Sequence, residues 1–392
     1  SCLCIFLLFI SIFFCACTNQ EENKILQSEK IDTGEWIVSE DVMDKPRDPA
    51  TANLLPDGNV LIMGGENNSA DTAEIFDPIK MKIIKSISLN DKRYYKYISV
   101  SLPDGDVFIA GGYLYPDNNL HPTNTAKKFN SRKYIFENIK SMKHYNDIGI
   151  DLKNGQVLLM NNIINPGAAG RENMRFQVYD SNTNSYFDVK NMIHKTNVTD
   201  KNFMTLENGN ILFTCYGSYP NNKDKSFLAA CIYDVKENRF KKYEELIPTE
   251  QLFIPLDTGS YLSIKPELTY SSGFVYNLNT KQKIPVNNNI PRTWRAGIYP
   301  QTILLDNGNV LILGINLVNS STEYETSRKN RRTAKYSAYI YDRKKNIFYE
   351  VQAPPYPVYN AGIVKLKNGD VLIAGGRIKY NKISDKIQIF KY

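Results

Sequence analysis

Basic, histidine and aromatic residues recur in short segments that lie between predicted strands. The members suited to holding a ligand are Arg47, Arg93, Tyr94, His144, Tyr145, His194, Trp294, Arg295 and Tyr359. A guanidinium group binds anions through paired hydrogen bonds, and a tyrosine or tryptophan ring offers an apolar face beside a polar tip. These residue types favour a surface that binds a carbohydrate or an anionic group. The alternative is a packing role, because the chain holds 26 tyrosines throughout its length.

Metal-dependent catalysis has little support in the sequence. Copper needs several converging imidazoles or thiolates, and the chain has only three histidines, His121, His144 and His194, in separate segments. We therefore expect no metal site and no cofactor, and no set of catalytic residues can be assembled.

The charge balance argues against nucleic acid as a partner. A net charge of +7 arises from 48 basic and 41 acidic residues, which is a mild excess for this length. The basic run 327–332 lies in a long predicted loop, 316–335, and could bind phosphates or anionic headgroups. A solvated loop is the favoured interpretation of this run. It contains no aromatic side chains on which nucleic-acid bases could stack, so a nucleic-acid partner is not expected.

The first 32 residues read as a targeting segment and a tether. Residues 2–16 are uncharged and almost wholly apolar, but too few to span a bilayer, which favours a secretory signal. The segment ends in Phe14-Cys15-Ala16-Cys17, which resembles a bacterial lipobox. The resemblance implies cleavage before Cys17, acylation of its thiol and anchoring in a bilayer. Residues 17–32 would then be a flexible tether, and the location a bacterial cell envelope, outside the cytoplasm.

Two cysteines remain in the body of the chain. Cys215 and Cys231 fall on two consecutive predicted strands joined by a loop near residues 217–226, so they could lie opposite one another. In an exported protein a cross-strand disulfide is plausible. Two small buried thiols are the equal alternative.

One phrase repeats along the rest of the chain: an apolar strand, an Asp-Gly or Asn-Gly turn, and a second apolar strand. The turn glycines recur about every 50 residues, at Gly58, Gly105, Gly155, Gly209, Gly259, Gly308 and Gly369. Such a pair between apolar runs predicts a hairpin in which both turn residues take positive φ. A third strand then ends in an aromatic residue followed by Asp or Asn, and a polar turn leads into a fourth strand. Four strands per unit predict a propeller blade.

The motifs resemble the Kelch repeat. The di-glycine after the second strand, as in Gly64-Gly65, Gly111-Gly112 and Gly375-Gly376, and the aromatic-Asp pair after the third, as in Phe76-Asp77, carry the likeness. The resemblance covers residues 33–392 and implies an all-β, seven-bladed Kelch-type β-propeller like the central domain of galactose oxidase. Blades three to six depart from the pattern because their di-glycine is replaced.

The last repeat stops before its fourth strand. The missing strand is expected at the other end of the chain, where residues 35–38 precede the first blade and include one of only two tryptophans. A ring closed in this way has no open edge between its first and last blades.

The resemblance also indicates where a ligand would bind. In Kelch propellers the loops between blades share a face with the loops joining second and third strands, and ligands meet that face. Family members also place a basic residue at the start of a repeat as a structural plug. We expect a monomeric binding or scaffold module for a glycan or a protein partner. The alternative is a carbohydrate-active enzyme, either a sugar mutarotase (epimerase-like) or a diverged galactose oxidase.

Overall fold

The computed structural model is all-β, with no α-helix in the part of the chain that it describes. The described residues are 33–65, 69–114, 119, 121–161, 176–190, 197–219, 222–242, 252–265, 272–287, 300–317, 334–356, 359–379 and 382–392. Residues 34–392 form one compact unit. No helix among these residues is long and apolar enough to cross a bilayer.

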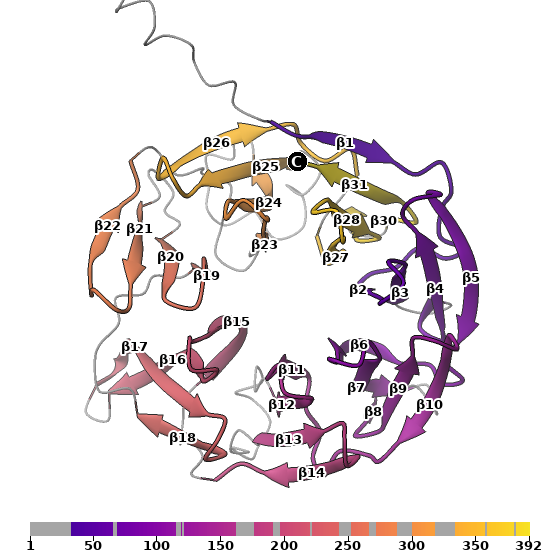
Figure 1. Cartoon of the computed structure of the whole chain (residues 1–392), viewed down its shortest axis with the longest axis horizontal. Helices are drawn as coiled ribbons and strands as arrows, with labels where there is room; N and C mark the ends of the chain where they lie inside the picture. The colour runs from indigo at the N-terminus through magenta and orange to yellow at the C-terminus, as the bar shows by residue number, and fades with distance from the viewer. Residues whose placement is uncertain are drawn as a thin grey trace, which may run out of the picture. The chain divides into compact units, whose positions relative to one another are not determined.

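Seven antiparallel sheets build the ring, and in each sheet the strands follow one another from the centre outwards (Figure 1). Blade 1 holds β2 (Ala50–Leu54), β3 (Val60–Gly64), β4 (Thr72–Asp77) and β5 (Lys82–Ser88). Blade 2 holds β6 (Tyr94–Ser101), β7 (Val107–Leu114), β9 (Ala126–Asn130) and β10 (Ile135–Ile139), with β8 (His121–Pro122) beside β7. Blade 3 holds β11 (Ile148–Asp151), β12 (Gln156–Met160), β13 (Phe176–Asp180) and β14 (Ser185–Asp188).

The remaining blades continue round the ring. Blade 4 holds β15 (Asn197–Thr205), β16 (Ile211–Tyr219), β17 (Asn222–Asp234) and β18 (Arg239–Lys242). Blade 5 holds β19 (Leu252–Pro255), β20 (Ser260–Lys265), β21 (Ser272–Asn277) and β22 (Lys283–Pro285). Blade 6 holds β23 (Gln301–Leu304), β24 (Val310–Leu317), β25 (Ala334–Asp342) and β26 (Ile347–Val351). Blade 7 holds β27 (Gly362–Lys365), β28 (Val371–Ala374), β31 (Ile387–Lys391) and β1 (Glu35–Val38), and the small pair β29 (Arg377–Lys379) and β30 (Lys382–Ile383) joins β28 to β31.

The predicted closure is confirmed. β1 pairs antiparallel with β31, so the strand order of blade 7 is β27-β28-β31-β1. The Trp36 ring lies 5.0 Å from the Phe390 ring, and its indole N–H donates to the carbonyl of Gln352 in blade 6 at 2.7 Å. The chain beyond β1 keeps following β31, with the N–H of Ser39 donating to the carbonyl of Ile387.

The Asp-Gly hairpins form as predicted, but the turn type differs. In blade 1 the N–H of Gly58 donates to the carbonyl of Leu55 at 3.0 Å, and the N–H of Leu55 donates to the carbonyl of Asn59 at 2.8 Å. This is a three-residue loop, and only Gly58 has positive φ (92°). The expectation of positive φ at both turn residues is wrong, because Pro56 holds the fixed negative φ that a type I turn needs at its first central position.

The aromatic-Asp pairs cap the outer turns. In blade 1 one carboxylate oxygen of Asp77 accepts the N–H groups of Ile79 and Lys80, both at 3.0 Å. The same arrangement recurs at Asn130, Asp180 and Asn277. These acidic and amide side chains stabilise the turns, so they are not candidates for catalytic groups.

The two sets of connections define two faces of the ring. We call the side with the Asp-Gly and aromatic-Asp turns the turn face, and the side with the inter-blade loops (39–49, 89–93, 140–147, 352–356 and 359–361 among the described residues) the loop face. Between the two faces, apolar side chains of neighbouring blades pack against one another. Leu61 and Ile75 of blade 1, for example, share a buried cluster with Ile109 and Phe129 of blade 2.

The strand pairing of blade 4 shows that the two cysteines are not opposite one another, contrary to what the sequence had suggested. β16 and β17 continue to Tyr219 and from Asn222, inside the segment expected to be a loop. Cys215 lies opposite Ala229 and Cys231 opposite Phe213, so the expected direct opposition is wrong. Diagonal neighbours on a sheet lie about 7–8 Å apart, beyond the usual reach of a disulfide. Cys231 is a buried thiol in the structure.

Close packing between blades 7 and 1 gives a first testable prediction. A Cβ on Gly362 of β27 would lie 2.7 Å from the carbonyl carbon of Thr51 and 2.9 Å from the amide nitrogen of Ala52, both backbone atoms of β2. We expect Gly362→Ala to lower the free energy of unfolding by about 1–3 kcal/mol, because backbone cannot move aside as a side chain can. Urea unfolding measures the change. The control is Gly259→Ala, whose Cβ would come no nearer than 3.3 Å to a flexible side chain and whose φ is not positive; equal losses for both would contradict the prediction.

Candidate functional site

One repeat position holds the inter-blade loops in place. It lies two residues before the aromatic of the third strand, in the middle of an otherwise apolar segment. In blades 1, 2, 3 and 7 it is occupied by the buried polar residues Glu74, Lys127, Gln177 and Gln388. Each contacts the loop that leads into its own blade, and we call these four the clamp residues. The equivalent residues of blades 4, 5 and 6 are Cys231, Phe274 and Tyr339.

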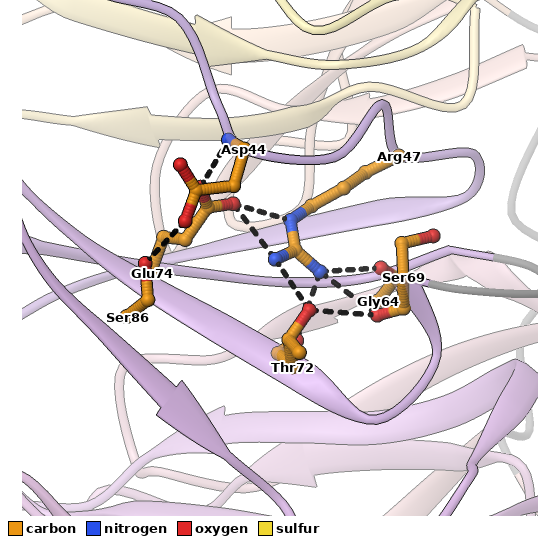
Figure 2. A network of polar contacts seen from close by, with 7 residues as sticks. All are labelled: Asp44, Arg47, Gly64, Ser69, Thr72, Glu74 and Ser86. Carbon is orange, nitrogen blue, oxygen red and sulfur yellow. Dashed lines mark hydrogen bonds and ion pairs between the residues drawn. The ribbon is translucent and has the colours of Figure 1, made fainter.

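In blade 1 the clamp works through Arg47, which is fully buried (Figure 2). Its Nε and Nη2 donate to one carboxylate oxygen of Glu74 at 3.0 and 2.7 Å. Nη1 donates to the carbonyls of Gly64, Ser69 and Thr72 at 2.8–3.0 Å. Every part of the guanidinium group is engaged by the protein, so Arg47 is a structural residue and not the ligand contact expected from its position in the sequence.

Blade 2 repeats this arrangement with Arg93, which is also buried. Its Nη1 donates to the carbonyls of Gly111 and Thr125, and its Nη2 to the carboxylate of Asp91 at 3.0 Å. The ammonium group of the clamp residue Lys127 lies 3.7 Å from the same carboxylate. Arg93 is therefore structural as well, and the exposed residues of this loop are Asn90 and Lys92.

The hydroxyl of Tyr97 lies between these two arginines. Tyr97 belongs to β6, and its hydroxyl shares a hydrogen bond of 3.0 Å with that of Thr51 on β2. Burial raises the pKa of Tyr97 to about 12, although the Thr51 contact and the charges of Arg47 and Arg93 act in the opposite direction. The group stays protonated at neutral pH and joins blades 1 and 2.

In blade 3 the clamp presents the predicted pair His144 and Tyr145. The Gln177 amide nitrogen donates to the carbonyl of His144 at 2.9 Å and to the side-chain oxygen of Asn146, and its oxygen accepts the N–H of Lys143 at 3.0 Å. Both predicted residues are half-buried on the loop face. Their backbone is fixed before any ligand arrives.

Tyr145 belongs to a small aromatic cluster on the loop face. Its ring centroid lies 5.8 Å from that of Tyr113, which extends from the end of β7 in blade 2. Burial, assisted by the nearby Asp147 carboxylate, raises the pKa of Tyr145 above its ordinary value. The cluster thus combines two phenol rings with a nearby carboxylate, a set that can stack on a sugar ring and hydrogen-bond to its hydroxyls.

In blade 7 the clamp holds a second aromatic residue. The side-chain amide of Gln388 accepts the N–H of Tyr356 at 3.2 Å and donates to its carbonyl at 3.0 Å. The N–H of Arg377 donates to the carbonyl of Tyr359 at 3.0 Å, and both Tyr356 and Tyr359 are half-buried. Tyr359 was predicted from the sequence, and Tyr356 joins it on the same fixed loop.

An ion pair crosses from blade 7 to blade 1 at the same face. Arg377 donates from Nε to the carboxylate of Asp48, which is fully buried, while the arginine side chain keeps 24% of its surface exposed. The N–H of Gly376 also donates to the carbonyl of Arg47 at 2.8 Å. This pair holds the closing blades together on the loop face.

The other residues predicted for this face divide into two groups. Tyr94 begins β6, but the placement of its side chain lies outside the described structure, as do His194, Trp294 and Arg295 altogether. Cys17 lies outside it too. The sequence analysis missed the clamp residues and the pair Asp48 and Arg377. The clamp residues could have been predicted from the sequence, because each is a polar residue two positions before the aromatic that ends a third strand.

Removing a clamp gives the second prediction. Gln177→Met keeps the length of the side chain but leaves the N–H of Lys143 and the carbonyl of His144 without partners, at a cost of about 1–3 kcal/mol for each buried group. We expect faster hydrogen exchange of the loop 140–147, measured by mass spectrometry. Gln156→Met in the same blade is the control, because Gln156 bonds to Asp180 near the turn face. Unchanged exchange in the Gln177 variant would contradict the role given to the clamp.

Comparison with known proteins supports the fold. No family model matches the sequence, and a search of curated proteins finds no match. Among solved structures, the chain is similar to a fungal alcohol oxidase of the AA5 family determined in complex with copper. The TM-score is 0.59 with 12% sequence identity, over 92% of this chain and 76% of the other. At this identity the likeness concerns the fold alone.

The described residues do not fit a copper site. No three His, Cys, Asp or Glu side chains among them come close enough together to hold a metal ion. His121 is exposed in β8, His144 lies on the clamped loop before β11, and His194 falls outside the described ranges. The donor set that copper needs is therefore not assembled by the described residues.

The sheet order, the closing strand and the structural neighbour agree with the sequence motifs. Seven four-stranded blades succeed one another, with di-glycines after the second strands of blades 1, 2 and 7 and capped turns after the third strands of blades 1 to 6. The chain is a seven-bladed β-propeller whose fold is similar to that of the AA5 alcohol oxidase, and its motifs resemble the Kelch repeat.

Proposed function

We propose that the protein is a lipid-anchored binding module of the bacterial cell envelope whose loop face binds a glycan. The observation that carries the proposal is the clamping of the inter-blade loops in blades 7, 1, 2 and 3. A loop that is already ordered loses little conformational entropy when it binds, and residues on loops of a rigid scaffold commonly carry function. Four buried side chains devoted to loop geometry are supporting evidence for recognition on this face.

The chemistry of the exposed groups supports a sugar as the ligand. Half-buried tyrosines on the clamped loops, Tyr145, Tyr356 and Tyr359, and Tyr113 at the end of β7 offer ring faces for stacking, and His144 and Asp147 lie on the same loop as Tyr145 and offer polar groups. Sugars present both apolar C–H faces and hydroxyls, which match this combination. The protein would be a monomer that needs no cofactor and binds no nucleic acid. Besides the glycan, it would contact the bilayer through the lipid chains on Cys17.

Glycan-array screening followed by calorimetry tests the proposal, using the chain from residue 18 onward, which lacks the acylation site. We expect binding of a defined glycan class that weakens at least about tenfold, or roughly 1.4 kcal/mol, in His144→Ala/Tyr356→Ala. The control Ile79→Ala/Arg132→Ala alters exposed residues of the turn face and should bind as the unmodified chain does. Equal weakening in both would show that the loop face is not the site. Absence of any glycan ligand would favour a protein partner.

One observation favours the enzyme as a second candidate. Asp147 is a half-buried carboxylate three residues after His144 on the loop face, and a sugar mutarotase needs only an acid–base group beside its substrate. NMR exchange spectroscopy of reducing sugars measures such an activity directly. An accelerated anomer exchange that Asp147→Asn abolishes would establish the enzyme in place of the binding module.

A further inference from the structure

The inner and outer turns lie on the same side of the ring. In blade 3 the N–H of Ser181, in the outer turn, donates to the carbonyl of Gly155 in the inner turn at 3.0 Å. In blade 6 the N–H of Arg343 donates to the side-chain oxygen of Asn309 at 3.1 Å. Tyr134 of the blade 2 outer turn reaches across to Asp57 of the blade 1 inner turn. These contacts establish the turn face as one continuous surface.

The chain enters the ring at this face. β1 occupies the fourth-strand position of blade 7, and a fourth strand begins at the outer turn of its blade. Glu35 pairs with Lys391 at the end of β31, and the hydroxyl of Tyr392 accepts a hydrogen bond of 3.0 Å from Asn309 beside the blade 6 inner turn. The segment after β1 then runs to Arg47 on the loop face. Glu35, the first residue of β1, is therefore on the opposite side of the ring from the clamped loops.

The outer turns on this face are basic. Exposed lysines or arginines occupy them in blades 1, 2, 4, 5 and 6, at Lys80, Arg132-Lys133, Lys236, Lys281 and Arg343-Lys344-Lys345. Among the described outer turns Glu237 is the exposed acidic residue, and it pairs with Arg239 and Lys241. Inner turns carry the exposed acidic residues Asp57, Asp104, Glu207, Asp257 and Asp306; Asp57 bonds to Tyr134, Asp257 pairs with Arg343 and Asp306 pairs with Lys365. In the outer turns Lys80 pairs with Asp77 and Lys345 with Asp342, so the positive charge of the outer edge rests on Arg132, Lys133, Lys236 and Lys344.

We infer that the turn face is the membrane-proximal surface and that its basic outer turns bind anionic lipid headgroups, so that the loop face points away from the bilayer. The inference rests on the anchor at Cys17 that forms part of the proposed function. A tether of about 16 residues has a mean reach of roughly 20 Å, which keeps the entry point close to the membrane. Each basic side chain within a Debye length of an anionic surface adds attraction, and this attraction weakens with salt.

The experiment measures the distance of each face from the bilayer. The full acylated chain, with Cys215→Ser as background, is reconstituted into phosphatidylcholine vesicles with and without about 30% phosphatidylglycerol, the anionic lipid. A donor dye is placed either on the turn face by Ile79→Cys, at a side chain that is 94% exposed, or on the loop face by Lys92→Cys. Energy transfer to an acceptor lipid reports how near each dye lies to the membrane.

We expect at least twofold greater transfer from residue 79 than from residue 92 on anionic vesicles, and a fall in that difference at high salt. The variant Arg132→Gln/Lys133→Gln/Lys344→Gln should reduce transfer from residue 79, whereas the loop-face control Lys92→Gln/Lys143→Gln/Lys382→Gln should not. Equal transfer from both faces would overturn the orientation, and a signal insensitive to lipid charge would overturn the headgroup contact. A chain that does not associate with vesicles overturns both. Glycan binding by the same sample is measured separately, so a failure here leaves the proposed ligand function to its own test.

Discussion

Deleting residues 33–40 is expected to lower the free energy of unfolding of the entire ring by about 4 kcal/mol or more. The deletion removes the ladder between β1 and β31 and exposes the partners of Trp36, a side chain whose burial is worth about 1.5–3 kcal/mol. It also leaves β31 as an open edge. The loss is large against the roughly 5–15 kcal/mol of a typical domain, and chemical denaturation followed by tryptophan and tyrosine fluorescence measures it.

A matched deletion of eight residues before the ring, 20–27, is the control and should unfold like the unmodified chain. Trp36→Ala should fall between the two, because it keeps the backbone pairing of β1 and loses the contacts with Phe390 and Gln352. Identical midpoints for the deletion of 33–40 and the tether deletion would show that closure contributes nothing to the stability of the ring.

Arg47→Met is expected to cost about 3–5 kcal/mol, because it leaves the Glu74 carboxylate buried without its counter-charge. The N–H of Asp44 would remain as a bonding partner of that carboxylate, at 2.6 Å, but it carries no full charge. Urea unfolding of the single variants, and of Arg47→Met/Glu74→Leu, forms a double-mutant cycle. We expect the double variant to be less destabilised than the sum of the single variants by about 2 kcal/mol or more.

The matched control is Lys80→Met, which breaks the pair between Lys80 and Asp77 on the turn face. The lysine side chain is 70% exposed, and exposed pairs contribute at most about 1 kcal/mol. If Arg47→Met cost no more than Lys80→Met, the arginine would not be the structural centre of its loop, and a direct role in ligand contact would return as an explanation for it.

The blade order and the closure could be predicted because they depend on local patterns. Alternating apolar runs specify strands, and the repeat length specifies four of them per blade. The turn geometry was available too, since Pro56 before Asp57-Gly58 already argues for a three-residue loop. The register of β16 and β17 was less accessible, because strand pairing there continues into a segment with no di-glycine to end it.

The loop face was predictable only in outline. The inter-blade loops lie where the repeats predict them, but Arg47 and Arg93 were interpreted as ligand contacts, because sequence position does not reveal whether a guanidinium group points outward or into the turns beneath it. Burial decides that point: Arg47 and Arg93 have almost no exposed surface, and most of their donors bond to carbonyls, carboxylates and hydroxyls of the protein itself. Gln177 and Gln388 were overlooked because a single polar residue in a strand is usually ascribed to an exposed edge.

The pairing of β1 with β31 has a consequence for biosynthesis. The strand that completes blade 7 is among the first parts of the ring to leave the ribosome, and its partner is the last. Contacts between segments so far apart in the chain form slowly, so β1 stays unpaired while almost all the other blades are synthesised. A nascent ring therefore carries an exposed strand edge at each end until its final residues arrive, and this interval is when it is most open to chaperones and to pairing with another copy.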